Sequence, residues 1–248
     1  MDVYEETYKL LAQRHFSYFD SIKLVDWAVM MLENGYDSVS LIILAGLDKD
    51  STEEREKYFW KTIEELSIEV NKADFELIDN YAIYIAESVV NNKISPKDGL
   101  SIMQNIVRST DYSHKYIQFY DLDEDLDYLK YNNSTIFNIG LSLENADSFI
   151  VKEFDLFLET EKLEVDDRIR DSAFCKKCGM IERPKLKTKR NWIGNAKYQY
   201  WACGLCESED ILHFKSQQGK EIILKKIKTQ PNTRYSVRQE VDDFTVKH

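Results

Sequence analysis

Cys175-Lys-Lys-Cys178-Gly179 and Cys203-Gly-Leu-Cys206 are the two stretches that decide the fold of the last third of this chain. They contain all four cysteines, in two pairs of identical spacing that 24 residues separate. Two residues between cysteines let one tight turn present both thiolates to one ion, and a second turn completes a tetrahedron of sulfur ligands. The spacing therefore predicts one structural Zn²⁺, because four thiolates leave no open position for catalysis. Gly179 suits a turn that needs a positive φ.

Paired cysteines also occur as disulfide bonds and as redox-active Cys-x-x-Cys pairs. The chain begins Met1-Asp-Val-Tyr-Glu-Glu, which is acidic and unlike the basic start of a signal peptide, and no apolar run approaches the roughly 20 residues of a membrane span. We therefore expect a cytoplasmic protein without membrane contact, a setting that disfavours disulfides. A redox pair usually accompanies a βαβ pattern, which this sequence lacks.

The charge of the chain is divided unevenly. All 248 residues together carry −11. Residues 1–170 carry −18 (17 Lys and Arg against 35 Asp and Glu), whereas residues 171–248 carry +7 (16 against 9). Such asymmetry predicts two domains with different partners. We place an acidic helical domain over residues 1–168 and a basic zinc-binding domain over residues 169–248.

Apolar residues recur with helical spacing through residues 1–165. Ser51-Thr-Glu-Glu54 is a capping box, and Ser95-Pro96 places a cap and a first-turn proline before another helix. The short connections predict antiparallel neighbours, so we expect an all-α bundle or a short α-solenoid. With the zinc-binding part, the whole chain is predicted to be α+β. One predicted core stripe consists of Leu24, Ala28 and Met31.

Two segments of the acidic part stand out. Residues 37–47, Asp-Ser-Val-Ser-Leu-Ile-Ile-Leu-Ala-Gly-Leu, predict a buried central helix, with a partner-binding face as the alternative. Residues 121–127 carry five carboxylates but lack the glycine and the final carboxylate of a calcium loop, whose places hold Leu126 and Asn132. We expect this run to be a solvated loop and helix start; an acidic docking surface and a mimic of nucleic-acid charge are alternatives.

The region of residues 20–110, with its Gly35-Tyr-Asp-Ser38 lead-in to the apolar segment, resembles small helical bacterial proteins of unknown function. Some of those proteins occur among toxin-immunity and defence genes. The resemblance implies a helical fold and a connection to bacterial defence. It carries no functional residue onto this chain.

The stretch between the cysteine pairs is basic and aromatic. Its first half alternates cations with Pro184, Leu186 and Thr188, which in a strand sends the cations to one face. A turn at Gly194-Asn195 and a returning strand over 197–201 complete a hairpin. Cations neutralise phosphates and aromatic faces stack bases. The predicted nucleic-acid-binding residues are Arg183, Lys185, Lys187, Lys189, Arg190, Trp192 and Lys197.

Two further expectations concern this basic part. The ridge of cations has an intramolecular alternative, in which it lies against the acidic helical domain. After the second cysteine pair, a second β-hairpin is predicted, with strands at 211–215 and 221–228 and a turn at Gln217-Gln-Gly219.

Residues 173–215 resemble the zinc-ribbon family. The resemblance rests on Cys175, Cys178, Cys203 and Cys206, on the hairpin between the pairs, and on the tyrosine and tryptophan residues that precede Cys203. Zinc ribbons are common in transcription, translation and nucleic-acid-processing proteins, and also serve as docking modules. The resemblance therefore implies a contact with nucleic acid or with protein.

We expect an intracellular, non-enzymatic binding protein whose ribbon contacts nucleic acid and whose helical domain contacts a protein. One alternative is a protein-only adaptor, antitoxin or immunity component whose acidic domain engages a basic partner. The other is an enzyme with an unrecognised site in the helical domain, since missing motifs are weak evidence against catalysis. The sequence supplies no catalytic residue: its four histidines are isolated, and phosphate-binding loops and nucleophile elbows are missing. The oligomeric state is left open.

Overall fold

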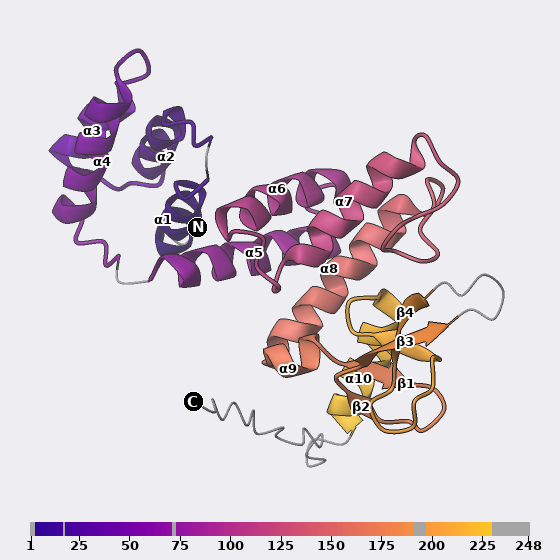
Figure 1. Cartoon of the computed structure of the whole chain (residues 1–248). Coiled ribbons are helices and arrows are strands. Elements are labelled where there is room, and N and C mark those ends of the chain that lie inside the picture. Colours follow the sequence, from indigo (N-terminus) through magenta and orange to yellow (C-terminus); the bar gives the residue numbers. More distant parts are fainter. Residues whose placement is uncertain (1–2, 17, 71–72, 191–196, 230–248) are drawn as a thin grey trace, which may run out of the picture. The chain divides into compact units, whose positions relative to one another are not determined.

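The computed structural model describes residues 3–16, 18–70, 73–190 and 197–229. Within these residues the chain forms ten helices and two small antiparallel sheets, which confirms the predicted α+β class (Figure 1). The chain divides into two compact units, Met1–Ile117 and Gln118–His248. None of the helices in the described ranges is both long enough and apolar enough to cross a membrane.

The first unit is helical throughout its described residues. Helices α1 to α4 pack as neighbours along the chain, and α5 packs against both α1 and α6. The predicted core stripe of α2 is fully buried, and the hydroxyls of Ser51 and Ser95 accept the N–H groups of Glu54 and Asp98 as predicted. The elements are α1 (Val3–Gln13), α2 (Ile22–Glu33), α3 (Val39–Ala45), α4 (Thr52–Glu65), α5 (Asp74–Val90) and α6 (Pro96–Ser109).

Helix α3 is less buried than its sequence predicts. Leu41 and Leu44 are fully buried, whereas 72% of Val39 and 57% of Ile42 remain exposed. The helix packs against α2 and α4, which cover one face of it. The prediction of a buried central helix is therefore wrong for the other face, because an apolar run does not record which of its sides finds a partner.

The second unit begins with helical structure. Phe119 of α7 packs against Phe154 and Phe157 of α8, with ring centroids 4.8 Å and 5.6 Å apart. The acidic run 121–127 lies inside α7, so the prediction of a loop and helix start is wrong, and Asp125 within it is fully buried. The helices are α7 (Ile117–Leu129), α8 (Ala146–Lys162), α9 (Asp167–Arg170) and α10 (Gln217–Thr229).

Five strands form the two sheets of this unit. One sheet has the order β2-β1-β5, all antiparallel, and the other is the β3-β4 hairpin. The pairing of β3 with β4 confirms the two predicted strands between the cysteine pairs, whereas the predicted turn at Gly194-Asn195 lies outside the described residues. The strands are β1 (Ala173–Cys175), β2 (Ile181–Glu182), β3 (Lys185–Arg190), β4 (Lys197–Ala202) and β5 (Ile211–His213).

The predicted second hairpin is wrong: β5 is a strand, but residues 217–229 form helix α10. Ser216 directly precedes the first residue of α10. Its hydroxyl accepts the N–H of Gly219 and so caps the N-terminus of the helix. Ile223, Leu224 and Ile227 share one helical face and pack into the core of the unit. The order of apolar and charged residues over 221–228 fits a helical period of three to four residues as well as it fits the alternation of a strand.

Helix α8, strand β2 and helix α10 share one core. Lys220 of α10 and Glu153 of α8 form an ion pair whose side chains are almost completely buried. Helix α8 packs on α10, so both belong to the second compact unit. The division between the two units lies between residues 117 and 118, whereas the net charge of the chain changes sign near residue 168. The buried core cluster consists of Leu156, Val165, Ile181, Phe214, Ile223 and Leu224.

Candidate metal centre and nucleic-acid interface

The two cysteine pairs fold into the same backbone turn. The N–H of Cys175 donates to the carbonyl five residues later (2.9 Å), and the N–H of Gly179 donates to the Cys175 carbonyl (2.8 Å). Cys203 and Glu207 repeat both bonds, at 2.9 Å and 3.1 Å. The residue after each second cysteine has a positive φ, 74° at Gly179 and 58° at Glu207. The expectation for Gly179 is confirmed, and the two turns are structural repeats.

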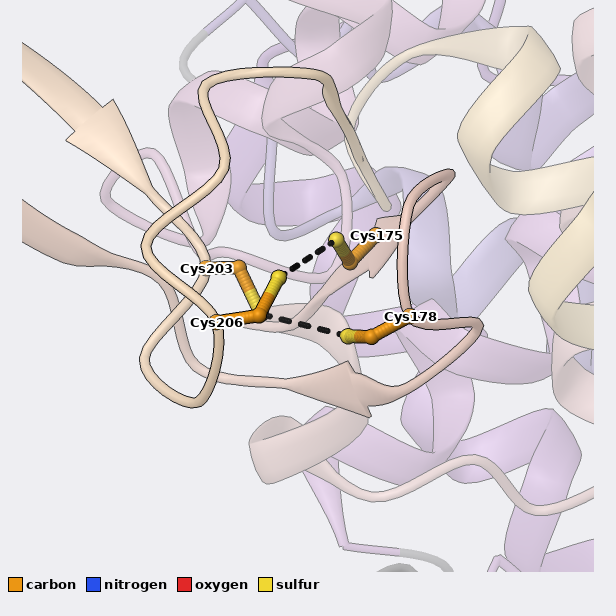
Figure 2. Close-up of side chains that lie close together, drawn as sticks. All are labelled: Cys175, Cys178, Cys203 and Cys206. Atoms are coloured by element: carbon orange, nitrogen blue, oxygen red, sulfur yellow. Dashed lines mark hydrogen bonds between the residues drawn. The ribbon is translucent and has the colours of Figure 1, made fainter.

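The repeated turns bring the four predicted ligands together. The sulfur atoms of Cys175 and Cys206 lie 3.6 Å apart, as do those of Cys178 and Cys203 (Figure 2). All four sulfur atoms lie within 4.8 Å of one another. These separations are far longer than the roughly 2.05 Å of a disulfide bond, and all four cysteines are free. The cluster could hold a metal ion.

The local surroundings shift the pKa values of Cys175 and Cys203 in opposite directions. Burial opposes ionisation of Cys175, but the N–H groups of Cys178 and Lys177 donate to its sulfur and lower its pKa to about 7. Burial raises the pKa of Cys203, and the neighbouring carboxylate of Glu182 raises it further. Cys175 is therefore prepared for metal ligation near neutral pH, whereas Cys203 must give up a firmly held proton.

Glu182 is a residue beside the cluster that the sequence reasoning missed. Its Oε1 accepts the N–H of Leu205 (2.8 Å) and lies 2.9 Å from the sulfur of Cys203. The carboxylate thus ties strand β2 to the second turn. A glutamate four residues after a Cys-x-x-Cys pair is not part of a known motif, so the sequence does not predict this contact.

The β3-β4 hairpin separates its residues between two faces. Lys185, Lys187 and Lys189 share one face with Tyr198 and Tyr200, because successive side chains of a strand alternate. The predicted ridge is therefore confirmed for three of its four cations. Arg183 precedes β3, and its guanidinium lies 3.9 Å from the Asp171 carboxylate.

The lysine face has intramolecular partners that were not predicted. Lys187 pairs with Glu207 (2.5 Å) and Lys189 pairs with Glu209 (3.4 Å). Both acids belong to the segment Glu207-Ser-Glu209-Asp210, directly after Cys206. The position of this acidic segment next to a basic hairpin in the sequence is the feature that could have predicted these ion pairs. Exposed pairs of this kind stabilise a fold little and can exchange partners.

The opposite face pairs Arg190 with Lys197 and Leu186 with Trp201 across the strands. Arg190 and Lys197 have no ion-pair partner within the part of the chain that the structure describes, and 49% of Trp201 is exposed. Two exposed cations and a half-exposed indole, which packs edge-on against His213 with ring centroids 6.1 Å apart, therefore share one face. The predicted stacking residue Trp192 lies outside the described residues. Trp201 is not among the residues predicted to contact nucleic acid.

A cavity of about 340 Å³ lies between α1 and α5 in the first unit, lined by Tyr4, Tyr8, Tyr81 and Tyr84 among others. Burial would lower the pKa of Lys9 in its wall, but hydrogen bonds to Glu5 and Glu6 outweigh burial and raise it. Burial raises the pKa of Tyr81 to about 12. Both side chains therefore keep their protons near neutral pH.

No protein-family model, curated protein or solved structure matches this chain significantly. The resemblances to zinc ribbons and to defence-associated helical proteins therefore stay predictions. The four-cysteine cluster and the open face of the hairpin are the features on which a function can be argued.

Proposed function

We propose that this protein binds one structural zinc ion and uses the β3-β4 hairpin to contact single-stranded nucleic acid. The geometry of the cysteines supports zinc. A tetrahedron with zinc–sulfur bonds of about 2.3 Å has edges of about 3.8 Å, and two of the sulfur pairs are 3.6 Å apart. Four thiolates suit zinc or an iron–sulfur cluster, but a small ribbon with paired turns is the usual setting of zinc.

The observation that carries the nucleic-acid proposal is the exposed hairpin itself. Residues 183–202 contain six cations and no carboxylate, and nine of the twelve residues of β3 and β4 are exposed. A two-stranded sheet that buries so little does not serve the core of the unit. Its cations and aromatic rings match the phosphates and bases of a single strand.

Within the hairpin, we assign the first contact to the face of Arg190, Lys197 and Trp201. Arg190 and Lys197 repel one another across the strands unless an anion lies between them. The lysines of the other face join by exchanging Glu207 and Glu209 for phosphates. Both faces can therefore contribute, in unequal measure.

The test is the salt dependence of binding of the full-length, zinc-loaded protein to a labelled oligonucleotide, single- or double-stranded. The double variant Arg190→Glu/Lys197→Glu is expected to lose at least tenfold in affinity, and its slope of log K against log salt should fall by about 1.4, since each phosphate contact contributes about 0.7. Trp201→Ala is expected to lose about 5- to 150-fold with little change in slope, because stacking contributes about 1–3 kcal/mol per base.

A matched control reverses two cations elsewhere, Lys93→Glu/Lys225→Glu, which are exposed and outside the hairpin. This variant has the same net charge as the hairpin variant and should bind within about twofold of the wild type, because neither changed residue belongs to the proposed contact. Equal losses in both double variants would mean that only net charge matters. Failure of the wild type to bind at low salt would refute the nucleic-acid proposal.

A second candidate function is a protein-only adaptor, and a specific feature favours adding a protein contact. Large apolar side chains are exposed on α3 and on the connection between α7 and α8. Exposed apolar groups in one place mark interaction surfaces. A protein contact through these side chains uses other residues than the hairpin, so a protein contact can also accompany nucleic-acid binding.

A further inference from the structure

The connection between α7 and α8, residues 130–145, is called the apolar loop below. It exposes large apolar side chains to an unusual extent: 86% of Tyr131, 62% of Ile136, 49% of Phe137, 86% of Ile139 and 54% of Leu143. A connection of this length normally presents polar residues to water. Several large exposed apolar groups in one loop therefore mark it as a surface that is covered in a complex.

The loop is held in shape by a buried carboxylate. Asp125 of α7 is fully buried and accepts the N–H groups of Ile136 (2.6 Å), Phe137 (3.0 Å) and Asn138 (2.6 Å). The side-chain amide of Asn138 donates to the same carboxylate at 2.9 Å. Four donors on one buried carboxylate are strong, charge-assisted bonds. They fix the backbone at the residues whose side chains point outward.

Further bonds complete the loop. The side chain of Asn145 accepts the N–H of Ser142 and donates to the carbonyl of Gly140, both at 2.8 Å. Gly140 has a φ of 89°, which only glycine adopts without strain. The apolar loop is thus ordered in the free protein, and a partner that binds it does not have to pay the entropy of ordering it.

The charge around the loop selects the kind of partner. Residues 117–147 contain seven carboxylates, of which Asp125 alone is buried, and one lysine, so the remaining groups carry a net charge of −5. Such a surface repels nucleic acid and the anionic face of a membrane. It attracts a cationic partner that also offers an apolar stripe, and a basic amphipathic helix combines the two.

We propose that the apolar loop and the acidic α7 helix bind a basic amphipathic helix of a protein partner. Ile136, Phe137 and Ile139 contact the apolar stripe of that helix, and the carboxylates of α7 face its lysine and arginine side chains. The inference rests on the protein contact of the second candidate function. It locates that contact in the second unit and gives its chemistry.

The experiment measures binding of the full-length protein to a synthetic amphipathic leucine–lysine peptide of about five helical turns, with a leucine–glutamate peptide of the same pattern as its opposite. The variant Ile136→Ser/Ile139→Ser keeps the net charge and changes only exposed side chains. It is expected to weaken the leucine–lysine peptide at least tenfold. The matched control Val39→Ser/Ile42→Ser removes similarly exposed side chains from α3 and should change affinity less than twofold.

Asp125→Asn tests the role of the buried carboxylate as a positioning group. Amide exchange at residues 136–138 should accelerate, and peptide affinity should fall several-fold although every apolar contact residue is present. Unchanged exchange would show that the carboxylate does not order the loop and would overturn this part of the proposal.

Four results would overturn the proposal: no binding of the leucine–lysine peptide, equal binding of the leucine–glutamate peptide, equal losses from the loop and α3 variants, or binding only to vesicles with anionic lipid. The hairpin variant Arg190→Glu/Lys197→Glu should bind the peptide like the wild type. The prediction that the hairpin variant loses oligonucleotide binding and the prediction that the loop variant loses peptide binding are therefore tested independently.

Discussion

At the residue scale, the two cysteine turns differ in the residue that follows their second cysteine. Gly179 and Glu207 both have a positive φ, although only glycine takes this conformation without a steric cost. Glu207 is held there by the turn's backbone bond to Cys203 and by its ion pair with Lys187. A glutamate at this position keeps a carboxylate beside the lysine face of the hairpin.

The variant Gly179→Ala is expected to lower the free energy of unfolding by about 1–2 kcal/mol, the cost of a Cβ in the left-handed region. The measurement is urea unfolding of the zinc-loaded protein. As a control, Gly46→Ala should leave stability unchanged or raise it, because Gly46 has a φ of −94° and room for a Cβ. A Gly179→Ala protein as stable as the wild type would contradict the assigned backbone strain.

The two unequal cysteines predict how metal binding depends on pH. Below the Cys175 pKa of about 7, the metal must displace a proton from that sulfur, and the raised pKa of Cys203 keeps its proton present to higher pH. Affinity should therefore rise with pH between 6 and 8, on the order of tenfold per pH unit for each displaced proton. Competition with a chelator at several pH values measures this dependence.

The variant Glu182→Gln removes the carboxylate that raises the Cys203 pKa. Its affinity curve should move toward lower pH, because the proton on Cys203 is then easier to displace. An unshifted curve would show that Glu182 does not control ionisation of the second turn.

At the element scale, helix α10 joins the metal-binding turns to helix α8. The buried ion pair of Lys220 and Glu153 lies in this contact, and exposed pairs of Lys152 with Glu221 (3.2 Å) and Lys228 with Glu159 (2.8 Å) flank it. A buried pair does not have to be stabilising overall, but removing one partner leaves an uncompensated charge.

Lys220→Met is expected to lower the free energy of unfolding by about 3–5 kcal/mol, because Glu153 is left buried without a cation. The double variant Lys220→Met/Glu153→Leu should recover most of that loss, since an apolar pair suits the surrounding core. Urea unfolding of both single variants and the double variant gives the coupling energy. Additive losses would show that the two side chains do not interact.

At the scale of the whole molecule, each compact unit has its own core. Removing the metal with a chelator should increase amide exchange in β1, β5 and α10, because structural metal binding supplies folding free energy to the small unit that surrounds the cysteines. The amides of α2, α5 and α6 in the first unit should keep their protection. Hydrogen exchange followed by mass spectrometry measures both, and simultaneous loss of protection in both units would mean that they fold as one.

The amino-acid sequence by itself determined the local features. The spacing of the cysteines indicated a four-sulfur cluster, the caps at Ser51 and Ser95 indicated helix starts, and alternation over 185–190 indicated a strand. These features depend on neighbours within a few residues of one another. Local spacing and backbone preference are sufficient to predict them.

Only the tertiary structure decided which surfaces are covered. The same apolar patterns fit a buried and a half-exposed α3, or a strand and a helix over 217–229, and the packing of α10 on α8 resolved the second choice. Likewise, contacts between separate elements bury Asp125, whose carboxylate accepts the N–H of Asn138, and pair Glu207 with Lys187. Burial and pairing depend on residues far away in the chain, and a pattern of neighbouring residues does not record them.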